Sequence, residues 1–200
     1  MATLIDGSKV DANSIELNGS TSGAVTIQAP AVAGTTTITL PSTSGTLALA
    51  GGGGSSIEYF DCYESTSTNV NSGAVVPFDQ TRQNSDGAIF SLSSGVVTIS
   101  ETGVYVFNFQ TTTSTTSGVA RSTTYAWLEQ NTGGGFSAVA GSYHYMYNRT
   151  TGNGESTGSS SLVLSVTSGY SYRVYCQIYS GTDTVGTLAN ASRLTIMKIA

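Results

Sequence analysis

The sequence predicts an all-β protein, and three observations support that class. Several segments of the C-terminal part alternate between apolar and polar residues with a period of two, as strands with one buried face do. Turns containing Gly95, Gly103, Gly133 and Gly169 separate these segments. No segment of this part shows the apolar period of an amphipathic helix. Many short strands without helices predict an antiparallel sandwich or jelly roll.

The first 50 residues are predicted to be a separate N-terminal β-rich anchoring segment. Residues 1–22 form an arm with one short alternating stretch, Ser14–Leu17. Residues 23–50 contain three strand-length units, VTIQAP, TTTITLP and TLALA, each bounded by Gly, Pro or Ser. Units this short do not bury a core alone, so we expect them to pair with each other or with another protein. The apolar side chains expected to anchor this segment are Val25, Ile27, Ile38, Leu40, Leu47 and Leu49.

The remaining chain is predicted to be a hinge followed by one compact domain. Residues 51–56 read GGGGSS, which predicts a flexible hinge because glycine runs favour no single backbone conformation. Residues 57–200 form the all-β domain. Its clearest strands are GVYVFNFQ from Gly103, YSYRVYCQIY from Tyr170 and SRLTIMKIA from Ser192. Further strands are expected over residues 57–63, 88–92, 96–100, 123–130, 136–147 and 160–166.

Composition and charge exclude several classes of partner. Charged residues make up 10% of the chain, against roughly 25% in ordinary soluble domains. A low fraction of charged residues is common in proteins of large assemblies. The net charge is −5 and the seven basic residues are scattered, so no nucleic-acid partner is expected. No apolar run approaches the roughly 20 residues that span a bilayer, and the N-terminus lacks the pattern of a signal peptide. We therefore expect a soluble product made in a cytoplasm, without membrane insertion.

Two cysteines, Cys62 and Cys176, lie far apart in the sequence. Their spacing matches no zinc motif, so no metal is expected. Free buried thiols are the favoured interpretation for a cytoplasmic product. A disulfide is the alternative, and it requires that the two strands adjoin.

The sequence lacks a recognisable catalytic constellation, so no enzyme activity and no cofactor are predicted. The one histidine, His144, stands between two tyrosines, and no G-x-S-x-G elbow surrounds a serine. The carboxylates are dispersed, which gives no support to the facing pair of a glycoside hydrolase. Gly51–Gly54 is not followed by Lys-Ser/Thr and is no phosphate loop. A polysaccharide depolymerase remains the enzymatic alternative.

An aromatic cluster, YHYMY at residues 143–147, allows two interpretations. Exposed aromatic residues mark recognition surfaces, which makes Tyr143, His144, Tyr145 and Tyr147 a candidate ligand patch. In the other interpretation, alternate members simply face the core or an interface between subunits.

The C-terminal domain resembles the C1q/TNF-like trimeric jelly roll over about 140 residues. The resemblance rests on VPFD from Val76 with AIF and GVVTI after it, on ETGVYVF from Glu101, and on SLVL, SGY and SRLTI towards the C-terminus. It implies a homotrimer with aromatic residues of one sheet packed around the three-fold axis. The residues expected at that contact are Tyr105, Phe107, Tyr172 and Tyr175. Where the family usually carries an acidic residue, this chain has Tyr170, so the family's calcium sites are not expected.

The N-terminal segment resembles segments of tailed-bacteriophage virion proteins, through AVTIQAP from Ala24 and TTITLP from Thr36. Together the two resemblances imply a structural protein on the outer surface of the virion. The predicted function is that of a homotrimeric capsid decoration (cement) protein. It clamps neighbouring major capsid proteins through residues 1–50 and displays an outward jelly-roll knob. The alternative is a tail-fibre or receptor-binding tip that recognises a host surface glycan.

Overall fold

The computed structural model describes residues 14–18, 24–28, 57–118, 121–149 and 154–200. The chain divides into two compact units, Met1–Gly52 and Gly53–Ala200, and the division falls within the glycine run. In the first unit, β1 (Ser14–Asn18) and β2 (Ala24–Gln28) pair antiparallel, with Leu17 opposite Val25 and Ile15 opposite Ile27. Among the described residues no helix is long and apolar enough to cross a membrane.

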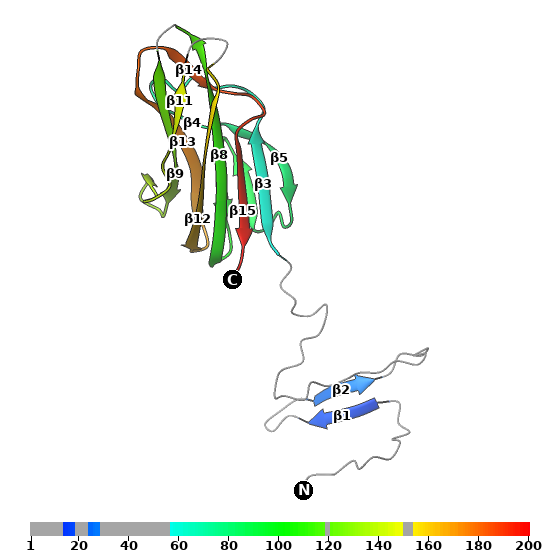
Figure 1. Ribbon diagram of the computed structural model, residues 1–200. Coiled ribbons are helices and arrows are strands. Elements are labelled where there is room, and N and C mark those ends of the chain that lie inside the picture. Colours follow the sequence, from blue (N-terminus) through cyan, green and yellow to red (C-terminus); the bar gives the residue numbers. More distant parts are fainter. Residues whose placement is uncertain (1–13, 19–23, 29–56, 119–120, 150–153) are drawn as a thin grey trace, which may run out of the picture. The chain divides into compact units, whose positions relative to one another are not determined.

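The second unit is a sandwich of two antiparallel sheets (Figure 1). Within the described residues one sheet has seven strands: β4 (Ala74–Val75), β6 (Phe90–Ser93), β7 (Val96–Ile99), β9 (Ser122–Asn131), β10 (Phe136–Ala138), β11 (His144–Asn148) and β13 (Tyr170–Ser180). The other has six: β3 (Tyr59–Glu64), β5 (Phe78–Asn84), β8 (Gly103–Ser117), β12 (Ser156–Val166), β14 (Thr184–Thr187) and β15 (Arg193–Lys198).

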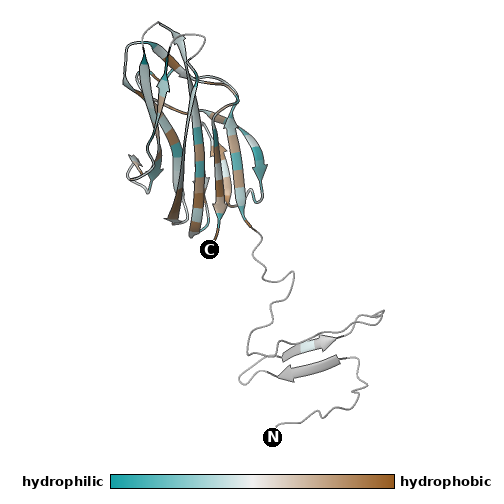
Figure 2. Ribbon diagram, in the orientation of Figure 1, coloured by the Kyte–Doolittle hydropathy of each residue, from teal (hydrophilic) through white to brown (hydrophobic). Residues whose placement is uncertain are grey.

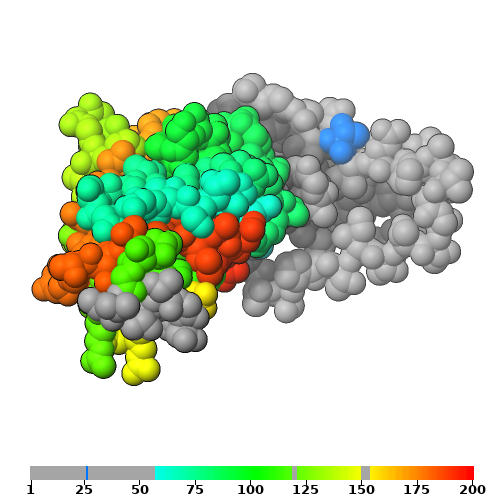
Figure 3. Space-filling model, turned by 90° about the horizontal axis from the view of Figure 1, so that it is seen from above, coloured from blue at the N-terminus to red at the C-terminus, as the bar shows by residue number. Residues whose placement is uncertain are grey.

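The strand orders follow the non-sequential pattern of a jelly roll. The seven-stranded sheet runs β10-β9-β13-β7-β6, with β11 pairing β9 and β4 pairing β13. The six-stranded sheet runs β12-β8-β15-β3-β5, with β14 pairing β8. Its first and last strands in the sequence, β3 and β15, are neighbours, and their cyan and red surfaces lie together in Figure 3. The start of β3 and the C-terminus therefore share one end of the sandwich, which we call the entry end; the opposite end is the distal end.

Every second side chain along the strands points inwards and packs in the core between the two sheets. Figure 2 shows brown and teal residues alternating along the strands. The ring of Phe107 lies 4.6 Å from that of Tyr172 across the sandwich, and Phe60 lies 5.7 Å from Phe90, between ring centroids. Such aromatic pairs add about 0.5–1.5 kcal/mol each beyond their burial. The period-two alternation predicted for β8, β13 and β15 is therefore confirmed.

Towards the distal end the core becomes polar, and this explains why β8 is longer than the sequence predicts. The strand predicted from the sequence, GVYVFNFQ, ends at Gln110. In the structure the strand continues to Ser117. Thr113 and Thr124 are fully buried and hydrogen-bonded to each other at 2.9 Å, so their hydroxyls are satisfied inside the sandwich. Propensity alone does not reveal this pairing, since it joins two distant segments.

Three other strand predictions need correction. Residues 136–147 are divided into β10 and β11, with a turn between them. The strand expected over residues 160–166 begins earlier, because β12 starts at Ser156. The strands β4, β5 and β14 were not expected. Both cysteines are free and buried, which confirms the favoured interpretation; the Cys62 thiol donates to the Leu194 carbonyl at 3.7 Å.

Candidate functional site

Aromatic side chains gather on the outer face of the seven-stranded sheet. They come from three adjacent strands, β9, β11 and β13, and from the turn before β11. We call this set the aromatic surface; its members are Tyr125, Trp127, Tyr143, Tyr145, Tyr147, Tyr175 and Tyr179.

Strand register places these side chains next to one another. Tyr145 on β11 lies opposite Tyr125 on β9, which in turn lies opposite Gln177 on β13. Trp127 on β9 lies opposite Tyr175. Because side chains two residues apart on a strand share a face, the aromatic residues of each strand fall in line.

The rings are packed on one another in a fixed arrangement. Tyr125 is the centre: it is stacked on Trp127 at 4.8 Å, on Tyr145 at 5.8 Å and on Tyr143 at 6.2 Å between centroids. Tyr179 stands edge-on to both Tyr125 and Tyr145. Trp127 is 8% exposed and forms the floor, whereas Tyr143, Tyr145, Tyr147 and Tyr179 are 44%, 57%, 47% and 64% exposed.

One ion pair lies beside the aromatic surface. The Arg173 Nε donates to Glu129 at 2.6 Å, and the guanidinium lies 3.9 Å from the centre of the Phe136 ring. The indole nitrogen of Trp127 also donates to Glu129, at 3.2 Å. Burial, together with the neighbouring tyrosines, raises the pKa of Tyr125, which keeps its hydroxyl neutral. The members of the aromatic surface are thus tyrosines and one tryptophan, which are uncharged residue types, and the Arg173–Glu129 ion pair lies at one side of them.

The structure separates the members of the predicted ligand patch. Tyr143, Tyr145 and Tyr147 lie on the exposed face, as the patch requires. His144 does not: it is 8% exposed, points into the sandwich and packs on Phe109 with 5.2 Å between ring centroids. Burial lowers the pKa of His144 to about 4. Period-two alternation makes this unavoidable, since neighbours on a strand face opposite ways.

The residues expected around a three-fold axis also need correction. Tyr105, Phe107 and Tyr172 are 0% exposed and belong to the core of the single chain. They cannot contact another subunit unless the sandwich opens. Tyr175 lies on the opposite face of β13 from Tyr172, within the aromatic surface. The alternation was read correctly, but the faces that carry Tyr105, Phe107 and Tyr172 are the inner ones.

A second surface, on the outer face of the six-stranded sheet, was missed. One row crosses four strands, each member directly opposite the next: Val163, Val106, Met197 and Tyr59. Three of these residues are exposed, Val163 at 62%, Tyr59 at 39% and Met197 at 38%. We call this set the apolar row. It lies towards the entry end, and the sequence carried a signal for it, because GVYVFNFQ is apolar on both faces near its start.

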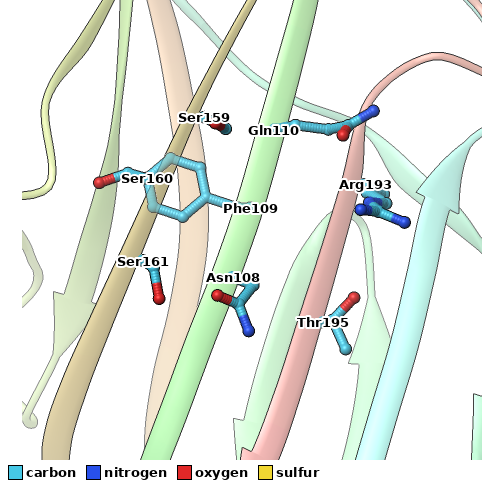
Figure 4. Close-up of a pocket in the computed structure, with 8 residues that line it drawn as sticks. All are labelled: Asn108, Phe109, Gln110, Ser159, Ser160, Ser161, Arg193 and Thr195. Atoms are coloured by element: carbon cyan, nitrogen blue, oxygen red, sulfur yellow. The ribbon is translucent and has the colours of Figure 1, made fainter.

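Next to the apolar row the same face becomes polar and is hollowed. The hollow has a volume of about 560 Å³. Figure 4 shows it spanning β12, β8 and β15, with three serines on β12 at one side and Arg193 and Thr195 on β15 at the other. Its lining residues are Asn108, Phe109, Gln110, Ser159, Ser160, Ser161, Arg193 and Thr195.

Of the residues predicted to anchor the N-terminal segment, Val25 and Ile27 lie in β2, the hairpin partner of β1. Ile38, Leu40, Leu47 and Leu49 lie outside the described residues. The anchoring role of all six stays a prediction.

Several carboxylates of the described residues are held by partners within the jelly roll. Asp61 is paired with Arg82 at 3.1 Å, and Asp79 accepts hydrogen bonds from Ser65. Glu64 is fully buried and accepts a hydrogen bond from the Thr187 hydroxyl. No group of three or more potential metal ligands occurs in the described part of the chain.

The aromatic members that the sequence analysis did not single out are Tyr125, Trp127 and Tyr179. Tyr125 and Trp127 alternate in TTYAWLEQ, and Tyr175 and Tyr179 share the outward face of YSYRVYCQIY. Both segments are apolar or aromatic on both faces, which is the signal of a strand with a functional outer surface. Their assembly with residues 143–147 depends on the β9–β11 and β9–β13 pairings, which no local pattern predicts.

Comparisons with known proteins bear on the fold. No protein-family model matches the chain, and no curated protein matches it. Among solved structures, murine APRIL is similar at 13% identity and a TM-score of 0.53, over 72% of this chain and 100% of that one. The globular domain of zebrafish complement 1qA is similar at 13% identity and a TM-score of 0.50, over 72% and 98%. The second unit of this chain therefore has the all-β TNF/C1q-type jelly-roll fold.

Proposed function

We propose that this protein is a homotrimeric capsid decoration (cement) protein on the outer surface of a bacteriophage virion. The observation that carries the proposal is the apolar row, which lies towards the end of the jelly roll where the chain enters. Association of three copies across this face would gather three N-terminal segments at one place. Contiguous exposed apolar residues of this kind mark interaction surfaces, and the TNF/C1q-type fold is compatible with a trimeric protein.

In this proposal the N-terminal segment binds the major capsid protein. The β1–β2 hairpin has two five-residue strands, which leaves edge hydrogen-bonding groups to pair with further strands. Strand addition to an edge of the major capsid protein uses those groups. Three linked segments contact several capsid subunits at once, so modest single contacts combine into a strong clamp.

Capsid binding of the full chain tests this proposal. Empty capsids lacking the protein are mixed with the full chain or with a chain that lacks residues 1–50, and bound copies are counted after sedimentation. The full chain is expected to saturate the capsid, and the truncated chain to stay in solution while keeping the melting temperature of the jelly roll. Decoration by the truncated chain at full occupancy would contradict the anchoring role.

A second candidate is a tail-fibre or receptor-binding tip that recognises a host surface glycan. The exposed tyrosines of the aromatic surface favour it, since exposed aromatic side chains are typical of recognition surfaces. Saturable binding of the full chain to host cells, without binding to capsids, would favour this candidate over the first.

A further inference from the structure

We propose that the aromatic surface binds a neutral, extended glycan, whose sugar rings lie against the exposed parts of Tyr143, Tyr145 and Tyr179. The inference deepens the second candidate function by naming the site and the chemistry of its ligand. It also holds for a decoration protein, because it requires only that this face of the jelly roll is open to solvent.

The first support is the preorganised geometry of the rings. Tyr125 and Tyr145 differ by 12° in ring plane, and Tyr125 and Tyr143 by 14°. Tyr179 stands nearly perpendicular to Tyr145, at 89°. Tyr143, Tyr145 and Tyr179 thus each pack on at least one other ring, so these three side chains have little rotamer freedom to lose on binding.

The second support is the size of the exposed area. An aromatic side chain carries about 150–250 Å² of surface, and the four most open tyrosines expose roughly half of theirs, which gives about 400 Å². A stable protein–protein interface needs about 800 Å² from each partner. The aromatic surface is therefore small for a protein partner, and it suits a chain of a few sugar units.

The third support is charge. Nucleic acid also stacks on aromatic residues, but it requires a positive groove along its backbone. Here the Arg173 guanidinium is held by Glu129 at 2.6 Å, and the chain carries a net charge of −5. A neutral ligand fits an uncharged surface, whereas a polyanion would be repelled by the acidic chain.

The fourth support is the combination of ring faces with polar tips. The carbon-bound hydrogens of a sugar ring carry a slight positive charge and match the negative face of an aromatic ring. Each tyrosine hydroxyl both donates and accepts hydrogen bonds, as sugar hydroxyls do. The Gln177 amide lies beside them, within 3.4 Å of the Tyr125 hydroxyl.

The position of the site suits display. In Figure 1 β11 lies near the distal end of the sandwich, away from the start of β3 and the C-terminus. The apolar row lies on the other sheet. Association through the apolar row would therefore leave the aromatic surface open.

The test uses the full chain on an array of neutral and anionic bacterial surface polysaccharides, followed by titration of the strongest binder through Trp127 fluorescence. We expect saturable binding to at least one neutral polysaccharide. Tyr145→Ala and Tyr179→Ala should each weaken it at least tenfold, and Tyr145→Phe, which keeps the ring, should weaken it less than Tyr145→Ala. The matched control is Tyr63→Ala, which removes a tyrosine of the six-stranded sheet: Tyr63 lies on β3 and contacts Arg82 on β5. This substitution should leave binding unchanged.

Three results would overturn the inference. The first is the absence of binding to every neutral polysaccharide of the array, or binding to anionic ones alone. The second is an equal loss of binding in Tyr63→Ala and Tyr145→Ala. The third is a change of oligomeric mass in Tyr145→Ala or Tyr179→Ala, which would make the aromatic surface an interface between copies of this chain. None of these outcomes depends on capsid binding, so the two proposals fail separately.

Discussion

Two buried ionisable groups, Glu64 and His144, should make the stability of the jelly roll depend on pH in opposite directions. The two contributions nearly cancel. Burial raises the pKa of Glu64 from 4.5 to about 7, although the hydrogen bond from Thr187 favours the charged form. Burial lowers the pKa of His144 from 6.5 to about 4. Asp79 lies near Glu64 and contributes to the raised pKa, and hydrogen bonds from Ser65 hold the pKa of Asp79 low, so its charge persists across this range.

The signs follow from which state binds more protons. Between pH 4.5 and 7 the folded chain holds the Glu64 proton and the unfolded chain releases it, so this contribution to stability is full below pH 4.5 and is lost as the pH rises to 7. Between pH 4 and 6.5 the unfolded chain protonates His144 and the folded chain does not, so this contribution is lost as the pH falls. Each of these two pKa shifts corresponds to a change of about 3 kcal/mol in the free energy of unfolding, at about 1.4 kcal/mol per pKa unit.

Single substitutions separate the two contributions. Glu64→Gln keeps an acceptor for Thr187 and removes the first titration; His144→Leu removes the second. The free energy of unfolding of each variant is measured by urea titration at each pH, and that of the unsubstituted chain is subtracted from it. In this difference the contributions of all other ionisable groups cancel. The difference for Glu64→Gln should become more favourable to folding by up to about 3 kcal/mol as the pH rises from 4.5 to 7. The difference for His144→Leu should become less favourable to folding by a similar amount as the pH rises from 4 to 6.5. Two flat difference curves would refute the assigned burial of both groups.

The other predictions concern the core and the apolar row. Tyr172→Phe should raise the melting temperature by a few degrees, because the Tyr172 hydroxyl is buried without a hydrogen-bond partner in the described residues. Tyr105→Phe should lower it, because its hydroxyl donates to the Glu101 carbonyl at 3.0 Å; shifts of equal sign would contradict this pair. Gly158→Ala should cost about 1–3 kcal/mol in chemical unfolding, since a Cβ there meets the His144 ring and the Met146 side chain at 3.1 Å; an unchanged stability would place His144 elsewhere. Met197→Asp should reduce the mass measured by light scattering to that of one chain that is still folded, and an unchanged mass would exclude the apolar row as the interface.

Much of the fold could be predicted from the sequence, because the strands with one buried face carry a clear period-two pattern. Tyr105 and Phe107 stand two residues apart in GVYVFNFQ, which places them on one face of the strand, and both lie in the core of the structure. The strand pairings could not be derived, since they join segments as distant as Cys62 and Leu194. For the same reason the length of β8 was underestimated: the burial of Thr113 depends on Thr124, from a different strand.

The candidate site was predicted only in part. The alternation of residues 143–147 correctly gives two faces, but the sequence does not say which one is exposed. Tyr143 and Tyr145 became part of a surface only through their neighbours Tyr125 and Tyr179, which belong to other strands. The trimer contact was misplaced because large aromatic residues suit a core as well as an interface, and Tyr172 lies in the core.

The mass of the purified full chain in solution tests the central claim most directly. Static light scattering coupled to size exclusion should give three times the 20.5 kDa mass of one chain, independent of concentration over the micromolar range. In the proposed function, a trimer allows three N-terminal segments to bind one capsid together. A mass of 20.5 kDa at all these concentrations would contradict the account, because a monomer has no multivalent clamp and leaves the apolar row exposed to water.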